Sequence, residues 1–240
     1  MLRTAYWYAH FAGSLIGKIP NMIKINSLEK KGETDKRYKY IHDTTSKWAM
    51  THIKASGARV TVHGKENIPT DGPVVFISNH QGNFDIALFM SFIDKPKGYI
   101  SKIEMEKIPL ISSWMKWMEC VFMDRSSLRK SAEAIVEGVK ILKKGHSLVI
   151  FPEGTRSRGD KVGEFKAGSF KLATKAKVPI IPVTINGSYK LMEETGRVKP
   201  ADVEMFIHKP IETSNLSKEE LDTLPDIVVD IIQSKLPSQE

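Results

Sequence analysis

Short apolar runs alternate with helical patterns from Ala58 onward, and this alternation restricts the possible folds more than any other feature of the chain. The predicted strands are 58–63, 74–79, 98–101, 120–124, 147–151, 180–185 and 202–207. The predicted helices are 86–92, 111–118, 127–143, 169–176 and 217–236. Such alternation predicts an α/β fold with a mixed, largely parallel sheet covered by helices. In sheets of this kind, functional residues gather beyond the carboxyl ends of the strands.

The segment Asn79–Asp85, which follows a predicted strand, combines a histidine with a carboxylate. On a regular helix, a separation of five residues would turn the two side chains about 140° apart. Gly82 and Asn83 indicate a turn instead, which can bring the Asp85 carboxylate back onto the His80 ring. A carboxylate on one ring nitrogen fixes the tautomer and leaves the other nitrogen to remove a proton. The pair can therefore activate a hydroxyl group, although the segment has no nucleophile of its own.

The segment Phe151–Arg158 offers groups that suit a phosphate. Gly154 lets the backbone approach a ligand closely, Thr155 offers a hydroxyl donor, and Arg156 offers a forked guanidinium. The spacing of a nucleotide-binding P-loop is missing. Arg125, at the end of the preceding apolar strand, is a second arginine candidate for the same kind of ligand.

The segment Val178–Ile185 is an apolar run in which Pro182 predicts an edge, a bulge or a strand start. A histidine–carboxylate pair, two arginine sites and an apolar strand together fit a substrate with a phosphate head and an apolar tail. Each segment alone also has a structural explanation. Asp85 can cap the helix that follows it, His80 can be a loop histidine, and the arginine segment can be a solvated turn with an Arg–Glu pair.

The four segments, in this order, resemble the four motif blocks of the glycerolipid acyltransferase family, and most closely its 1-acyl-sn-glycerol-3-phosphate acyltransferase branch. The blocks are Asn79–Asp85, Glu119–Arg125, Phe151–Ser157 and Val178–Ile185. One position departs from the family pattern, because Glu119 stands where the second block usually opens with glycine. Phe122 and Arg125 remain in register with that block.

The resemblance implies transfer of a fatty acyl group from an acyl thioester, on coenzyme A or acyl carrier protein, to the sn-2 hydroxyl of lysophosphatidic acid, which gives phosphatidic acid. His80, oriented by Asp85, would be the general base, with no acyl-enzyme, metal or cofactor. The residues expected at the acceptor phosphate are Arg125, Glu153, Gly154, Thr155, Arg156 and Lys102, with Glu153 holding the arginines. Phe122 and Pro182 are expected in the acyl-chain or donor region, and a backbone N–H near Gly82 or Pro182 is the candidate oxyanion donor. Glycerol-3-phosphate or another lysophospholipid is the alternative acceptor.

The charge balance agrees with an anionic partner. Thirty-six Lys and Arg against 28 Asp and Glu give a formal net charge of +8 and a sequence pI near 9.4. This favours acidic lipids, phosphorylated substrates or nucleic acid, but no nucleic-acid-binding motif is present, so no nucleic-acid partner is expected. The single cysteine, Cys120, excludes an internal disulfide and, inside an apolar run, is expected to be buried and inert.

Residues 1–56 are predicted to be an amphipathic pair of helices ahead of an α/β acyltransferase domain at 57–240. No stretch reaches the roughly 18 apolar residues of a spanning helix, and Pro20 should kink or restart the first helix. The residues predicted to bind an anionic membrane surface are Trp7, Phe11, Leu15, Ile19, Lys18 and Lys24. We therefore expect monotopic attachment to the cytoplasmic face of a membrane. The alternative is that these helical faces dock on the domain as core.

Two other classes of function fit parts of the pattern. A non-catalytic basic protein that binds membrane surfaces would explain the charge and the N-terminal helices, but not the grouping of His80, Asp85 and the arginines at strand ends. A phosphatase or hydrolase would need a nucleophile or metal-binding carboxylates, which the pattern does not offer. An acyltransferase accounts for both sets of features.

Overall fold

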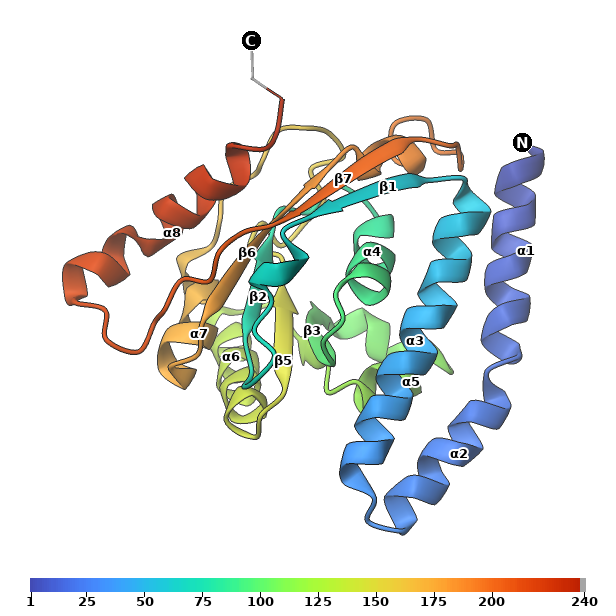
Figure 1. Cartoon of the computed structure of the whole chain (residues 1–240), viewed down its shortest axis with the longest axis horizontal. Coiled ribbons are helices and arrows are strands. Elements are labelled where there is room, and N and C mark those ends of the chain that lie inside the picture. The colour runs from blue at the N-terminus through green and yellow to red at the C-terminus, as the bar shows by residue number, and fades with distance from the viewer. Residues whose placement is uncertain (238–240) are drawn as a thin grey trace.

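A seven-stranded sheet runs through the molecule in the order β1-β7-β6-β2-β5-β3-β4, in a computed structural model that describes residues 1–237 (Figure 1). The strands are β1 Arg59–His63, β2 Val75–Ser78, β3 Lys97–Lys102, β4 Val121–Met123, β5 Ser147–Ile150, β6 Ile180–Asn186 and β7 Asp202–Ile207. Every neighbouring pair is parallel except β6 and β7. The predicted mixed, largely parallel sheet is confirmed, and each predicted strand is present within a few residues.

Helices cover both faces of this sheet (Figure 1). They are α1 Leu2–Ile16, α2 Ile19–Lys30, α3 Thr34–Ser56, α4 Phe84–Phe92, α5 Ile111–Trp117, α6 Leu128–Lys143, α7 Lys171–Ala176 and α8 Lys218–Gln233. Short 3₁₀ turns are η1 Lys65–Asn67, η2 Ile103–Lys107, η3 Ala167–Phe170 and η4 Ser188–Leu191. Strand side chains alternate between the faces, so Phe76 of β2 joins the core with α3 and α4, whereas Val75 and Ile77 join the core with α6, α7 and α8.

Pro182 lies inside the sheet, because β6 pairs with β2 on one side and with β7 on the other. The ladder towards β7 is irregular there. Ile180 pairs with Ile211 and Val183 pairs with Ile207, so three steps along β6 correspond to four on the opposite segment. A proline has no N–H to donate, and the register shift removes the need for one at this position. Of the three predicted settings for Pro182, the bulge-like one is found.

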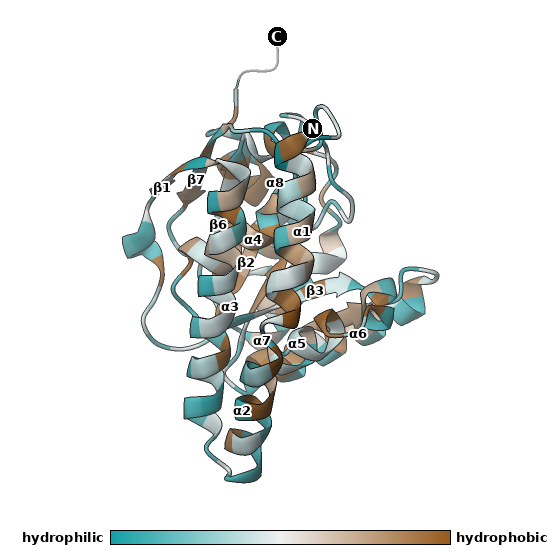
Figure 2. Ribbon diagram, turned by 90° about the vertical axis from the view of Figure 1, so that its right-hand side faces the viewer, coloured by the Kyte–Doolittle hydropathy of each residue, from teal (hydrophilic) through white to brown (hydrophobic). Residues whose placement is uncertain are grey.

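The N-terminal segment contains three helices where two were predicted, because the chain breaks at Gly17 and Lys18 and restarts with Pro20 in the first turn of α2. Figure 2 shows α1 and α2 at the outside of the molecule. The longer α3 packs on α4, and its Ala49 and Ile53 belong to the main core. Across residues 1–237, no helix combines the length and the apolar character that crossing a membrane requires.

Glu119 occupies the position where the family pattern has glycine, and its backbone explains that preference. Its φ of 58° lies in the left-handed region, which glycine adopts with less strain than other residues. The side chain is tied to α3, because the Tyr38 hydroxyl donates to its Oε1 at 2.8 Å and the Arg37 guanidinium lies 3.9 Å from the same oxygen. We infer that these contacts offset part of the backbone cost.

Candidate active site

Three of the predicted site segments and Lys102 meet at one edge of the sheet. The neighbouring strands β2, β5, β3 and β4 are mutually parallel, so their carboxyl ends lie together. His80 follows β2, Glu153 follows β5, Lys102 ends β3 and Arg125 follows β4. The loops are joined directly, since the Ser157 N–H donates to the His80 carbonyl at 2.7 Å. The expected gathering of site residues at the strand ends is therefore found.

The His80 and Asp85 side chains meet as the turn at Gly82 predicted. His80 Nδ1 lies 2.7 Å from Asp85 Oδ2, and the carboxylate is fully buried in the first turn of α4. Oδ2 also accepts from the backbone N–H groups of Gln81 at 2.7 Å and Gly82 at 2.9 Å. The Ser188 hydroxyl donates to Oδ1. Four donors thus compensate the buried charge, and the Gly82 N–H, once an oxyanion candidate, is already engaged.

The His80 ring is held from a second direction. It stacks on the Phe151 ring at a centroid distance of 4.2 Å and an angle of 22°. Its side chain is 18% exposed, and within residues 1–237 its Nε2 atom makes no hydrogen bond. Because Nδ1 faces a carboxylate, Nδ1 carries the proton in the neutral ring and Nε2 is the acceptor. The geometry therefore leaves Nε2 free to accept a proton.

Glu153 does not hold the arginines, so that prediction is wrong. Its Oε1 accepts from the His80 backbone N–H at 2.6 Å, and its Oε2 accepts from the Gly163 N–H at 2.8 Å. Burial raises the pKa of Glu153, while these two N–H donors act in the opposite direction. The carboxylate therefore fixes the backbone that carries His80, and it links the β2 loop to the loop after β5.

The two arginines have different partners. The Arg125 guanidinium donates to the Gly154 carbonyl, in a loop where Gly154 has a φ of 71°. Arg156 Nη1 lies 3.1 Å from the carboxylate of Glu193. Thr155 and Lys102 are exposed at the same edge. The structure thus brings every predicted phosphate residue to the carboxyl edge of the sheet, and it adds a carboxylate beside Arg156.

Three candidate functional residues were not identified from the sequence. Ser188 reaches Asp85 from η4, and Glu193 reaches Arg156 from the segment that follows η4. Lys166 is the third, because a Cβ placed on Gly154 would lie 3.2 Å from its Nζ and equally close to Arg125 Nη1. The turn pair Gly187–Ser188 after a strand was a usable signal for the first. Nothing in the local sequence marks the other two.

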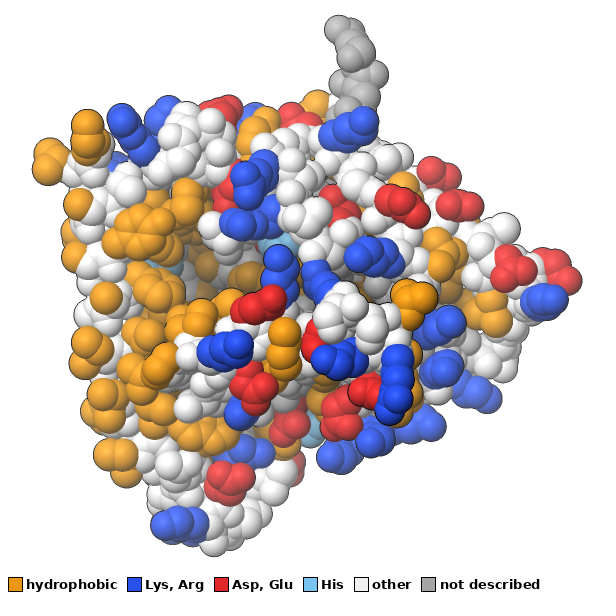
Figure 3. Space-filling model, turned by 180° about the vertical axis from the view of Figure 1, so that it is seen from behind, with side chains coloured by type: hydrophobic (Ala, Val, Ile, Leu, Met, Phe, Trp, Pro, Cys, Tyr) orange, Lys and Arg blue, Asp and Glu red, His pale blue; other side chains and the backbone are white. Residues whose placement is uncertain are grey.

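An apolar cavity of about 450 Å³ opens beside this site. Most of its wall comes from α1, α3, α4 and α5. The cavity reaches the His80 loop at Asn83 and Phe84, and Met192 also lines it. Figure 3 shows the apolar hollow and the basic side chains beside it. Burial lowers the pKa of His52 in its wall to about 4, with His10 acting in the same direction, so the His52 ring is neutral at pH 7. Cavities of this size and character hold the apolar parts of ligands.

The residues predicted for the acyl-chain region lie outside the cavity wall. Pro182 is buried in β6, and Phe122 lies on β4 two positions after Cys120, which does line the cavity. Its strand neighbours Val121 and Met123 face the core with α6, and side chains alternate along a strand, so Phe122 lies on the cavity's side of the sheet. Cys120 is buried, as predicted, and burial raises the pKa of its thiol to about 12.

The predicted membrane-binding residues divide between two faces. Trp7, Phe11, Leu15 and Lys18 line the cavity, and the Trp7 indole donates to the His52 carbonyl at 3.2 Å. Ile19 and Lys24 are exposed. The outward apolar side chains of α1 and α2 are Leu2, Tyr6, Ile16, Ile19 and Ile23, which are 43–90% exposed. The helical face predicted to meet lipid is thus largely the face that lines the cavity.

Comparisons with known proteins identify the family of this chain. The sequence profile of the acyltransferase family matches residues 59–186, and the chain belongs to that family. A probable 1-acyl-sn-glycerol-3-phosphate acyltransferase of Mycoplasma pneumoniae is 33% identical over 198 residues, covering 81% of this chain and 73% of the relative. A chloroplast 1-acyl-sn-glycerol-3-phosphate acyltransferase of Brassica napus is 36% identical over 178 residues.

The fold is also similar to a solved structure. The crystal structure of the 1-acyl-sn-glycerophosphate acyltransferase PlsC of Thermotoga maritima matches with a TM-score of 0.86 at 29% identity, covering 97% of this chain and 92% of that one. The aligned region covers 73% of this chain but only 51% of the Brassica protein, so the chain spans about half the length of its plant relatives. The predicted membership in the acyltransferase family is confirmed.

Proposed function

We propose that this protein transfers a fatty acyl group from an acyl thioester to the sn-2 hydroxyl of lysophosphatidic acid and so produces phosphatidic acid. The observation that carries the proposal is the His80–Asp85 pair: Nε2 of His80 makes no hydrogen bond within residues 1–237, and the loop that holds the pair also contributes Asn83 and Phe84 to the wall of the apolar cavity. The names of the relatives and of the solved neighbour support the same substrate class. A non-catalytic surface-binding protein would have no use for a buried, fully hydrogen-bonded carboxylate behind a histidine.

The reaction proceeds by direct transfer. His80 Nε2 removes the proton from the acceptor hydroxyl as the oxygen attacks the thioester carbonyl, and Asp85 stabilises the imidazolium that forms. The C–S bond of the tetrahedral intermediate then breaks, and the imidazolium returns the proton to the departing thiolate. A thiolate is a good leaving group, so no acyl-enzyme is needed. Coenzyme A and acyl carrier protein both present such a thioester.

The acceptor phosphate binds on the basic side of the cleft. Arg125 and Arg156 supply charge-assisted hydrogen bonds there, together with the exposed hydroxyl of Thr155 and the backbone at Gly154. Lys102 at the end of β3 adds positive charge at the same edge. Lys166 joins this set because it lies on the same side of Gly154 as Arg125.

A fatty acyl chain fills the apolar cavity. The walls combine aromatic rings of α1 and α3 with aliphatic and methionine side chains of α4 and α5, which suits a chain with no polar group. Asn83 and Phe84 belong both to the cavity wall and to the turn between His80 and Asp85. A chain in the cavity would therefore place its carbonyl end close to the base.

The N-terminal segment 1–56 attaches the protein to an anionic membrane surface without spanning it. The outward apolar residues of α1 and α2, with exposed lysines such as Lys24, form the amphipathic surface that such attachment requires. The same α1 lines the cavity with its other face. Membrane-borne substrate then reaches the site from the side on which the protein is attached, and the cytoplasmic side stays open to the acyl carrier.

The decisive experiment gives the purified protein a labelled acyl thioester and a panel of lysolipids, and identifies the products by mass. We expect phosphatidic acid from lysophosphatidic acid and little product from neutral acceptors. His80→Ala should lower turnover by about 10²–10⁴-fold. Preference for another acceptor would change the substrate assignment, and turnover by His80→Ala above about half of wild type would refute the mechanism.

A further inference from the structure

The Glu193 carboxylate occupies a position that is suited to a phosphate. Its Oε1 accepts from the Asn83 backbone N–H at 2.8 Å and from Arg156 Nη1 at 3.1 Å. Asn83 is the N-cap residue of α4, the helix that carries Asp85. A helix N-terminus and a guanidinium that point at one oxygen form an environment that binds phosphate oxygens well. The Glu193 side chain is only 5% exposed, so it fills this place from within the protein.

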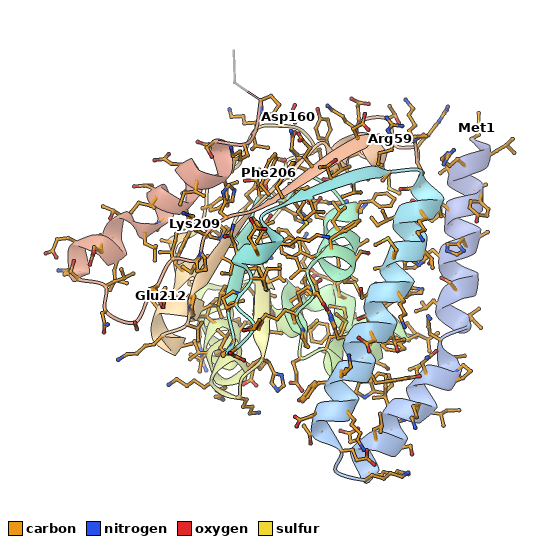
Figure 4. The ribbon with its side chains drawn as sticks, in the orientation of Figure 1. Met1, Arg59, Asp160, Phe206, Lys209 and Glu212 are labelled. Atoms are coloured by element: carbon orange, nitrogen blue, oxygen red, sulfur yellow. The ribbon has the colours of Figure 1, made fainter. Side chains whose placement is uncertain are left out.

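The Glu193–Arg156 ion pair differs from one that fixes an arginine in place. Both donors share Oε1, while Oε2 is buried without any hydrogen-bond partner among residues 1–237. An unpaired buried carboxylate oxygen is costly. By contrast, Arg59, labelled in Figure 4, makes a two-point pair with Asp202 through Nε at 2.6 Å and Nη2 at 2.8 Å. Glu193 holds Arg156 through one oxygen, so a ligand with more oxygens can replace it.

Glu193 also lies where the two parts of the site join. Its neighbour Met192 and its partner Asn83 both line the apolar cavity, and the Asn83 amide lies 3.7 Å from the Met192 sulfur. On the other side, Glu193 packs on Gly82, where an added Cβ would lie 2.5 Å from Oε2. In lysophosphatidate the sn-2 hydroxyl and the phosphate are carried by neighbouring carbons of the glycerol. When the hydroxyl reaches His80, the phosphate therefore lies close by. That phosphate would compete with Glu193 for the same donors.

The segment that carries Glu193 is fixed at both sides. Before it, Ser188 donates to Asp85, and the Tyr189 hydroxyl donates to Asp160, labelled in Figure 4, at 3.0 Å. After it, the Val198 N–H donates to Thr4 of α1 at 3.1 Å. The backbone therefore keeps Glu193 beside the site, so displacing its carboxylate needs only a rotation of the side chain.

We propose that Glu193 is an internal competitor for the acceptor phosphate: it occupies Arg156 and the Asn83 N–H in the empty enzyme and is displaced when a phosphate binds. This inference rests on the proposed function, in which Arg156 binds the acceptor phosphate. Acceptor and product carry the same phosphate, so tight binding of that group does not speed the chemical step and slows product release. The return of Glu193 to Arg156 weakens the binding of both acceptor and product and so promotes release of phosphatidic acid.

The test removes the charge and keeps the shape. Glu193→Gln should lower the KM for a short-chain, water-soluble lysophosphatidate about three- to tenfold. The inhibition constants of phosphatidate and inorganic phosphate should fall by the same factor, and kcat should stay equal or fall. Glu193→Ala, which removes the contact entirely, should shift the constants in the same direction. The matched control is Glu194→Gln, an equal charge change on the exposed neighbouring residue, which should leave all constants unchanged.

Arg156→Ala separates this inference from the proposed function. If Arg156 binds phosphate, the variant raises the KM and the phosphate inhibition constant. Glu193→Gln then has a smaller effect in that background, because of the two donors only the Asn83 N–H is left to be released. A Glu193→Gln variant with an unchanged or higher KM, beside an Arg156→Ala variant with a raised KM, overturns the competitor role alone. An Arg156→Ala variant with unchanged phosphate binding overturns the assignment of Arg156 on which the inference depends.

Discussion

Asp85→Asn is the sharpest perturbation of the site, because the structure dictates how the new amide must sit. Three donors point at Oδ2, namely His80 Nδ1 and the backbone N–H groups of Gln81 and Gly82. The amide oxygen has to take that place, since an NH₂ group there would face three donors. The NH₂ group then faces the Ser188 hydroxyl, which can rotate and accept. The variant should therefore keep the fold and the tautomer of His80 and lose only the charge.

The magnitude follows from this geometry. A hydrogen bond to a charged group contributes about 1.5–3 kcal/mol, and about 1.36 kcal/mol corresponds to a tenfold change. We expect kcat to fall about 10- to 150-fold, less than in His80→Ala and far more than in a surface change. A larger loss is known where such a substitution admits the wrong histidine tautomer, which the two backbone donors prevent here.

The assay is the initial rate at saturating concentrations of both substrates, with thermal unfolding measured in parallel. Asp222→Asn is the matched control, because Asp222 is exposed on α8 and the chemical change is the same. It should leave kcat unchanged. Activity above about half of wild type in Asp85→Asn would show that the buried charge does not assist His80. An unfolded variant would show that the charge is required for the fold.

Three further predictions concern the rest of the molecule. Ala87→Phe places a ring in the cavity wall, so acyl chains of the wild-type optimum should be transferred more slowly while shorter chains keep their rate; equal loss for all lengths would contradict the cavity assignment. Ile16→Ser with Ile23→Ser, on the outward face of α1 and α2, should weaken binding to anionic liposomes and spare turnover of a soluble acceptor; unchanged binding would move the membrane surface elsewhere. Burial lowers the pKa of Lys97 to about 7, so between pH 7 and 10 the unfolded chain binds a proton that the folded protein lacks. The free energy of unfolding should therefore rise with pH relative to Lys97→Met, and parallel curves would contradict this.

The sheet and the contact between His80 and Asp85 could be predicted because their signals are local. Strands buried on both faces read as continuous apolar runs, and the turn residues Gly82 and Asn83 marked the one conformation that brings His80 to Asp85. The order of the strands was not accessible, since it depends on crossovers that no local pattern encodes. The parallel character alone was enough to place the site segments at a common edge.

The partners of the site residues could not be predicted, because they come from distant parts of the chain. Ser188 lies 103 residues after Asp85, and Glu193 lies 37 residues after Arg156. The prediction for Glu153 failed for the same reason. Arg156 lies three residues after it in the sequence, but its position after β5 turns Glu153 towards the backbone N–H groups of His80 and Gly163. Opposite charges that are close in the sequence are thus not always close in the folded structure.

The N-terminal helices show how one amphipathic pattern can serve two surfaces. Membrane binding and docking on the domain are alternatives only if a helix has a single apolar face. In α1, Trp7, Phe11 and Leu15 line the cavity, whereas Tyr6 and Ile16 point outward. A helix that is apolar on more than one side requires apolar surroundings on each. The domain supplies them on the cavity side, and a membrane surface would supply them on the other, so the two alternatives describe opposite faces of the same helix. Deletion of residues 1–56 would remove the cavity wall and the core residues of α3 together with the attachment, and only substitutions on the outward face can test attachment by itself.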